Sequence, residues 1–150
     1  MNFLHQQKYL TRGNTGLIIL QGRSIVPGCR RGLALVSKKP ISFLGGVDPN
    51  SGLIVERDHD LKGKSVRGKI LCFPSGHGST VGSYVLYSLA KNDLGPKAIV
   101  NQTADPVVVV GAIIAEIPMI DQVDIRQIET GNDVEVDGKK GTVKIWKKGK

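Results

Sequence analysis

Short apolar runs, separated by glycine-rich and polar turns, predict a chain that is mostly β-structure. Candidate strands lie at residues 17–20 with 23–26, 32–37, 53–55, 69–73, 97–101 and 119–120. The turn Pro27-Gly28-Cys29 separates the first of these from the run at 32–37, and we expect the two to pair as a hairpin. Residues 133–146 alternate polar and apolar around Asp137-Gly138, which predicts a C-terminal hairpin.

One helix is predicted directly after the apolar run at 69–73. Five residues fall on one helical face, and Gly95-Pro96 stops the helix soon after Lys91. The face consists of Val81, Tyr84, Val85, Ser88 and Leu89. Because the next strand candidate follows at 97–101, this strand–helix–strand order predicts a right-handed parallel crossover.

The segment at 104–118 is ambiguous. Its four consecutive valines favour a strand, whereas Asp105 followed by Pro106 is typical of a helix N-cap with proline at the first helical position. We predict a short helix at 106–115, buried on nearly all sides, that ends before Pro118. The chain then reads as an α/β domain with a barrel-like, β-rich sheet and two main helices. Residues 17–146 form this domain, 1–16 a polar extension that could be disordered, and 147–150 a basic tail.

The net charge of +8 is concentrated near the C-terminus. Residues 139–150 hold six lysines and no acidic residue, which leaves 15 basic and 13 acidic residues elsewhere. This distribution favours a solvated tail, or a patch that docks an acidic partner, over a nucleic-acid-binding protein. The longest apolar run, 107–115, is far shorter than the roughly 20 residues that span a bilayer. We expect neither a membrane nor a nucleic-acid partner.

The two cysteines, Cys29 and Cys72, lie in dissimilar settings and predict neither a disulfide framework nor a zinc site. A reducing compartment, the cytoplasm, is the simplest interpretation. The N-terminus lacks an apolar core followed by a small-residue cleavage site, so it does not read as a secretory signal.

The loop "PSGHGST", residues 74–80, leads from an apolar strand into a helix and is the main candidate site. Glycine removes the Cβ that would block a ligand, and free N–H groups at a helix N-terminus favour an anion. The G-x-G-x-x-x-G spacing from Gly76 is one residue longer than the dinucleotide fingerprint, and no Gly-Lys-Ser/Thr ending of a P-loop is present. From the residues alone, Ser79 is either an N-cap, which we favour, or a nucleophile or base.

The three histidines are scattered and do not predict a metal site. His77 is a loop histidine that could in principle carry a phosphoryl group beside the helix N-terminus. His59, within "RDHD", is predicted to lie in a solvated turn.

Four motifs in order carry a family resemblance: "KKPISFLGGVDPNSG", "GKILCFPSGHGSTVGSYVLYSLAK", "GPKAIVN" and "GAIIAEIPMID". They resemble the aconitase X swivel-domain family, and within it the phosphomevalonate dehydratase small subunits, from about residue 22 to 146. The resemblance implies a swivelling β/β/α fold and a separate large subunit that holds a 4Fe–4S cluster. Cys29 and Cys72 are too few for such a cluster, which agrees with that division.

The resemblance also implies an activity and a base. The family reaction removes water from (R)-5-phosphomevalonate to give trans-anhydromevalonate 5-phosphate, in a branch of the mevalonate route to isoprenoids. The loop serine of the family, here Ser79, is implied as the proton acceptor. By position, Gly76, Gly78 and Thr80 are candidates to present N–H groups to the substrate, and the loop at 43–49 is expected to line the site or the interface.

Three other functions stay open. One is a dehydratase of another hydroxy acid, such as cis-3-hydroxyproline; the others are a phosphohistidine carrier that uses His77 and a plain anion-binding module.

Overall fold

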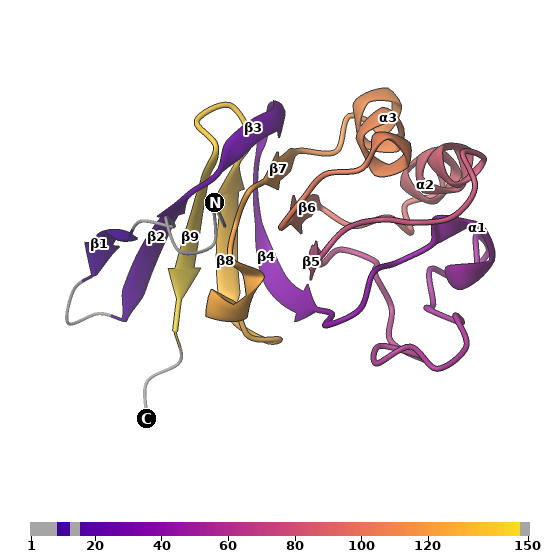
Figure 1. Ribbon diagram of the computed structural model, residues 1–150, viewed down its shortest axis with the longest axis horizontal. Helices are drawn as coiled ribbons and strands as arrows, with labels where there is room; N and C mark the ends of the chain where they lie inside the picture. The colour runs from indigo at the N-terminus through magenta and orange to yellow at the C-terminus, as the bar shows by residue number, and fades with distance from the viewer. Residues whose placement is uncertain (1–8, 13–15, 148–150) are drawn as a thin grey trace.

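The computed structural model describes residues 9–12 and 16–147, which form one mixed sheet and three α-helical segments (Figure 1). The α-helical segments are α1 (Phe43–Gly46), α2 (Gly82–Lys91) and α3 (Pro106–Ala115), and a short 3-10 turn, η2, spans Ile125–Gln127. The strands are β1 (Tyr9–Arg12), β2 (Leu17–Gln21), β3 (Arg23–Val26), β4 (Cys29–Val36), β5 (Ile70–Phe73), β6 (Ala98–Asn101), β7 (Met119–Asp121), β8 (Asp133–Asp137) and β9 (Thr142–Trp146).

The sheet closes on itself through a single bent segment. Its strand order is β1-β2-β9-β8-β4-β5-β6-β7-β3, and β2 and β3 are consecutive halves of one extended stretch joined at Gly22. The pairings therefore return to that stretch from both sides, from β9 and from β7. A Cβ at Gly22 would collide with the Asp121 carbonyl and the Val123 side chain, so the close approach at the bend requires glycine. The predicted barrel-like α/β fold with two main helices is confirmed.

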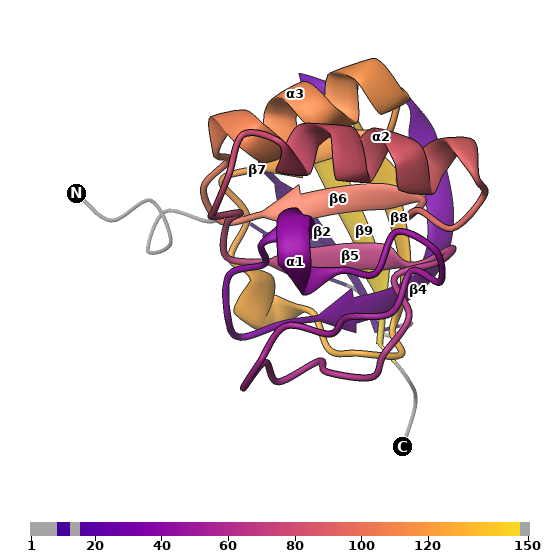
Figure 2. The same ribbon diagram turned by 90° about the vertical axis from the view of Figure 1, so that its right-hand side faces the viewer.

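The parallel half of the sheet separates two apolar cores. Three consecutive pairs are parallel: β4 with β5, β5 with β6, and β6 with β7. The helices α2 and α3 lie side by side on the outer face of these strands (Figure 2). Alternate residues of each strand point to opposite faces. Leu71 and Phe73 thus pack toward the helices, whereas Ile70 and Cys72 pack inside the barrel. The predicted parallel crossover from β5 through α2 to β6 is confirmed.

Two strand predictions are wrong. The run at 23–26 does not form a hairpin with the run at 32–37, because β3 pairs with β7 and β4 pairs with β8 and β5. As a central strand, β4 has both edges occupied, and β3 is needed to close the barrel. The run at 53–55 makes only isolated bridges, Val47 with Ile54 and Leu53 with Ser65. The C-terminal hairpin is confirmed as β8 and β9.

The two long helices have the predicted bounds to within a residue or two, but their faces differ. The residues of α2 that are buried are Gly82, Ser83, Leu86 and Leu89, and Tyr84 is 69% exposed. The prediction that α3 is buried on nearly all sides is wrong, since Val110 and Ile113 are about half exposed. Only one side of α3 meets α2 and the sheet, and the described residues leave its other side open.

The predicted N-terminal extension contains β1, which pairs with β2, while residues 1–8 and 13–15 lie outside the described part. Of the predicted basic tail only Lys147 is described; its N–H donates to Gly16. Within the described ranges, each helix is too short or too polar to cross a bilayer.

Candidate active site at the start of helix α2

The loop between β5 and α2 begins where the parallel strands end. Carboxyl ends of parallel strands are the usual place for ligands in open α/β sheets. Residues 77–81 of the loop are exposed, whereas Gly76 is buried. The candidate base, Ser79, therefore lies at the surface, just before the helix.

The Ser79 hydroxyl oxygen accepts a hydrogen bond from the Val81 N–H at 3.2 Å. The Ser79 carbonyl accepts from Gly82 N–H at 2.9 Å, so a tight turn precedes the regular helix. Val81 immediately precedes α2 and caps it with no side-chain bond. Ser79 thus supplies the expected cap-like bond, but it lies two residues ahead of the N-cap position, Val81. In the described residues this is the one hydrogen bond made by its side chain.

The backbone around Ser79 leaves three consecutive N–H groups without a partner in the described structure, those of Gly78, Ser79 and Thr80. Gly78 has φ = 94°, a conformation that favours glycine. Free N–H groups that precede a helix N-terminus form a natural anion site. Gly76 differs from the other predicted contacts, because its N–H donates to Asp105 Oδ1 at 3.1 Å.

The segment at 41–46, which we call the signature segment, overlaps the start of the predicted loop at 43–49 and packs against the Ser79 loop. Leu44 (φ −78°, ψ 117°) and Gly45 (φ 82°, ψ −16°) form a type II turn inside α1, as the Gly45-Gly46 pair suggests. Ser42 Oγ donates to the Leu44 carbonyl at 2.9 Å, and a Cβ at Gly78 would collide with that same Oγ. The His77 N–H donates to the Ile41 carbonyl at 3.1 Å. The segment at 41–46 and the Ser79 loop therefore pack closely, with one backbone hydrogen bond and one close contact at Gly78.

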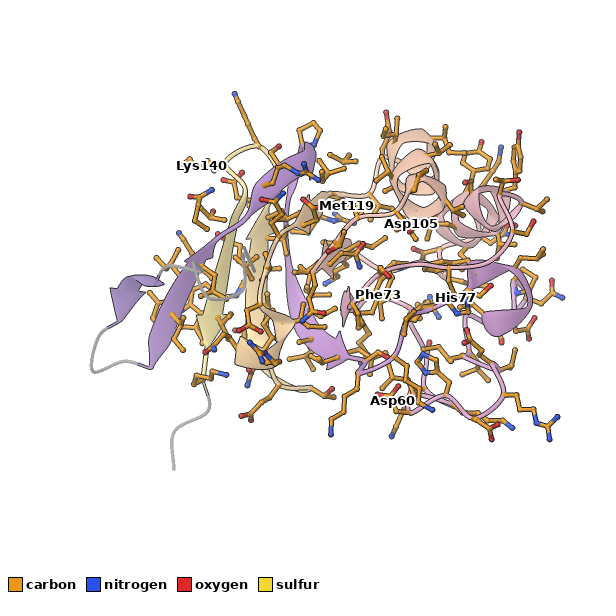
Figure 3. The ribbon with its side chains drawn as sticks, in the orientation of Figure 1. Asp60, Phe73, His77, Asp105, Met119 and Lys140 are labelled. Atoms are coloured by element: carbon orange, nitrogen blue, oxygen red, sulfur yellow. The ribbon has the colours of Figure 1, made fainter. Side chains whose placement is uncertain are left out.

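His77 contacts Glu56 and is half exposed. Its Nε2 lies 3.3 Å from Glu56 Oε2, while Glu56 Oε1 accepts from the Ser42 N–H at 2.9 Å. Glu56 thus joins the signature segment to the His77 side chain. Figure 3 shows His77 on the part of the chain that leads from Phe73 toward α2. Sequence reasoning missed Glu56, since it lies 21 residues from His77 and no local signal links them.

The predicted solvated turn is present, with Arg57, Asp58 and Asp60 exposed, but the His59 side chain within it is buried. Its Nδ1 accepts from the Leu61 N–H at 3.0 Å, and its Nε2 lies 3.1 Å from the Pro40 carbonyl. This arrangement fits a neutral ring with the proton on Nε2, which donates to Pro40. His59 therefore holds the loop at 57–64 in place, and its hydrogen-bond partners among the described residues do not include Ser79.

The two cysteines do not fit an iron–sulfur cluster. Cys72 is fully buried inside the barrel, and burial raises the pKa of its thiol strongly. Cys29 opens β4, whereas Cys72 pairs with Val36 at the far end of that strand. The seven intervening steps place them roughly 20 Å apart. Nor do the described residues contain a group of three or more potential metal ligands.

Two hollows flank the loop. One, of about 620 Å³, lies at the ends of β4, β5 and β6 against η2, and Val36, Pro74, Gln102 and Arg126 contribute to its lining. The other, of about 440 Å³, runs between α2 and α3 from Thr80 and Val81 to Val110 and Ile114, and no charged residue lines it. Ser79 lines neither hollow, but its neighbour Thr80 begins the second.

Comparison with known proteins gives consistent matches. The family model described as "Aconitase X swivel domain" matches residues 19–145. The chain is 53% identical over 130 residues to the "Phosphomevalonate dehydratase small subunit" of Pyrococcus furiosus, covering 87% of this chain and 97% of that protein. It is 54% identical over 129 residues to the protein of the same name from Methanocaldococcus jannaschii, covering 86% and 98%.

Solved structures match equally well. The crystal structure of Thermococcus kodakaraensis aconitase X in its holo-form superimposes with a TM-score of 0.84 at 51% identity, over 86% of this chain and 98% of that one. A solution NMR structure of a UPF0107 protein gives 0.79 at 45% identity, over 86% and 99%.

Proposed function

The chain belongs to the aconitase X swivel-domain family, and from this premise we propose that it is the small subunit of a phosphomevalonate dehydratase. The carrying observation is that relatives of that name are about half identical over nearly their whole length. The enzyme is then a hydro-lyase that converts (R)-5-phosphomevalonate to trans-anhydromevalonate 5-phosphate in isoprenoid synthesis. Residues 17–146 serve as its swivel domain.

We propose that Ser79 is the proton acceptor. The proton to be removed is on the carbon next to a carboxylate and is only weakly acidic. The base must therefore be strong, with a basicity close to that of an alkoxide. The Val81 N–H already donates to Ser79 Oγ, and the start of α2 adds a favourable field. Both stabilise negative charge as it forms on that oxygen.

The free N–H groups of Gly78 and Thr80 are the proposed contacts for an anionic group of the substrate. Gly78 and Thr80 are the residues on either side of Ser79. A carboxylate bound to their N–H groups would therefore bring the neighbouring carbon, which is to be deprotonated, close to Ser79 Oγ. The Gly76 N–H already donates to Asp105, so we propose that it holds the loop in place and does not contact the substrate.

We propose that the large subunit holds the iron–sulfur cluster, because Cys29 and Cys72 cannot meet on one. We also propose that this subunit covers the uncharged groove between α2 and α3, which begins beside Ser79 and carries the exposed Val81, Tyr84 and Val110. Large exposed apolar patches are typical of interaction surfaces. Free cysteines are consistent with the proposed cytoplasmic location.

The direct test is assembly and turnover. The chain is co-expressed anaerobically with its candidate large subunit, and the purified complex is incubated with (R)-5-phosphomevalonate; we expect co-purification and formation of trans-anhydromevalonate 5-phosphate, followed by mass spectrometry. A parallel incubation uses cis-3-hydroxyproline. Lack of co-purification, or turnover of the proline alone, would contradict the proposal.

A further inference from the structure

Asp105 uses its two carboxylate oxygens for two different tasks. Oδ2 accepts from the Val107 N–H at 3.2 Å and so caps α3, as the sequence predicts. Oδ1 accepts from the Gly76 N–H at 3.1 Å, across 29 residues of sequence. Figure 3 places Asp105 between α3 and the part of the chain that bears Phe73 and His77. One side chain therefore connects the start of α3 to the loop that carries Ser79.

The contact at Gly76 leaves no space for adjustment. A Cβ at Gly76 would collide with Asp105 Oδ1 and with the Val108 side chain, so the loop backbone lies directly on the first turn of α3. The next residue, His77, is fixed from the other side by the Ile41 carbonyl. Two consecutive backbone N–H groups are thus held immediately before the three that are free.

We propose that Asp105 is a positioning residue for Ser79, because it fixes the point from which the loop reaches the helix. The inference rests on the proposed function only in taking Ser79 as the base. A base works when it is held within hydrogen-bonding distance of the proton, and an error of about 1 Å can cost roughly a hundredfold in rate. The free N–H groups of Gly78 and Thr80 depend on the same anchor.

The two tasks can be separated by substitution. Serine is as good an N-cap as aspartate, but it has one oxygen and a shorter side chain. Asp105→Ser therefore keeps a partner for Val107 and removes the acceptor for Gly76. The matched control is Asp137→Ser, since Asp137 Oδ1 accepts from the Lys139 N–H at 3.1 Å in the β8–β9 turn and lies outside the loop contacts.

The first measurement uses the assembled complex with 5-phosphomevalonate. For Asp105→Ser we expect kcat to fall about 10- to 100-fold and KM to rise by less than about threefold, because displacing the base costs more than the smaller loss from displacing the Gly78 and Thr80 N–H groups. Asp137→Ser is expected to keep kcat within about twofold. Unchanged kcat in Asp105→Ser would overturn the positioning role.

The second measurement uses the full chain without its partner, so it does not depend on the reaction. Amide hydrogen exchange by NMR is expected to be at least about tenfold faster at Gly76 in Asp105→Ser and unchanged at Val107, while the backbone order parameter of Ser79 falls. Unchanged exchange at Gly76 would overturn the tether. If the wild-type complex fails to turn over 5-phosphomevalonate, the proposed function fails, and these NMR values still decide whether Asp105 holds the loop.

Discussion

Two serines at the start of α2 allow stability and catalysis to be separated by the same substitution. Ser79 Oγ makes one exposed hydrogen bond, from Val81 N–H at 3.2 Å, so Ser79→Ala should cost about 0.5 kcal/mol, the low end for a lost cap. Ser83 is buried, and its Oγ donates to the Val107 carbonyl at 2.7 Å. Ser83→Ala should therefore cost about 1–2 kcal/mol.

For a chain of this length each kcal/mol lowers the melting temperature by about 2–4 °C. We expect a loss of about 1–2 °C for Ser79→Ala and about 2–8 °C for Ser83→Ala, measured by calorimetry on the chain alone. The order should reverse for turnover by the complex. Removing a general base costs about 10²- to 10⁴-fold, whereas Ser83→Ala should stay within about threefold below its melting temperature.

Two results would refute this reasoning. A Ser79→Ala complex that retains more than about a tenth of wild-type kcat would show that Ser79 is not the base. A Ser83→Ala complex that is folded and assembled yet loses as much activity as Ser79→Ala would show that both losses report the position of the helix.

Three further predictions concern the partner, the histidine and acid stability. Tyr84→Lys should weaken binding to the large subunit about tenfold or more by calorimetric titration, whereas Leu33→Lys, at an exposed site in the antiparallel half of the sheet, should not; equal effects would argue against the groove between α2 and α3. His77→Ala should keep kcat within about tenfold, and labelling of His77 by a phosphodonor would instead support a carrier. Burial raises the pKa of Asp60, but hydrogen bonds from the Lys38 N–H and the Ser37 hydroxyl outweigh this effect and lower the pKa overall. That stability is present above the unfolded pKa of about 3.9 and is lost as the pH falls through the folded value, so Asp60→Asn should flatten the drop in melting temperature below about pH 4; an equally steep drop would contradict this.

Local signals account for the elements that the sequence predicts well. Asp105-Pro106 marks the start of α3 through an N-cap bond within two residues, and alternation around Asp137-Gly138 marks the β8–β9 hairpin. The loop that contains Ser79 is predicted correctly as well, because the apolar run before it and the helical spacing after it are both local signals. In each case the decisive contacts join neighbours in sequence.

Contacts between distant segments explain what the sequence could not predict. The barrel closes because Arg23 in β3 lies opposite Asp121 in β7, 98 residues away, where two hydrogen bonds of 2.8 Å join their side chains. The buried face of α2 differs from its apolar face because Gly111 of α3 lets Ser83 and Leu86 approach closely. His59 is buried because the Pro40 carbonyl is available to it from another loop.

The glycines of the Ser79 loop illustrate how composition can mislead about rigidity. A run such as "PSGHGST" suggests a flexible loop, yet a Cβ would collide with Asp105 at Gly76 and with Ser42 at Gly78. Glycine stands there because neighbouring atoms occupy the space that a side chain would need. The N–H groups beside Ser79 are thereby held in fixed directions before any substrate arrives. Fixed dipoles stabilise a developing charge without the cost of reorienting, so a closely packed loop suits the proposed role of Ser79 as the base.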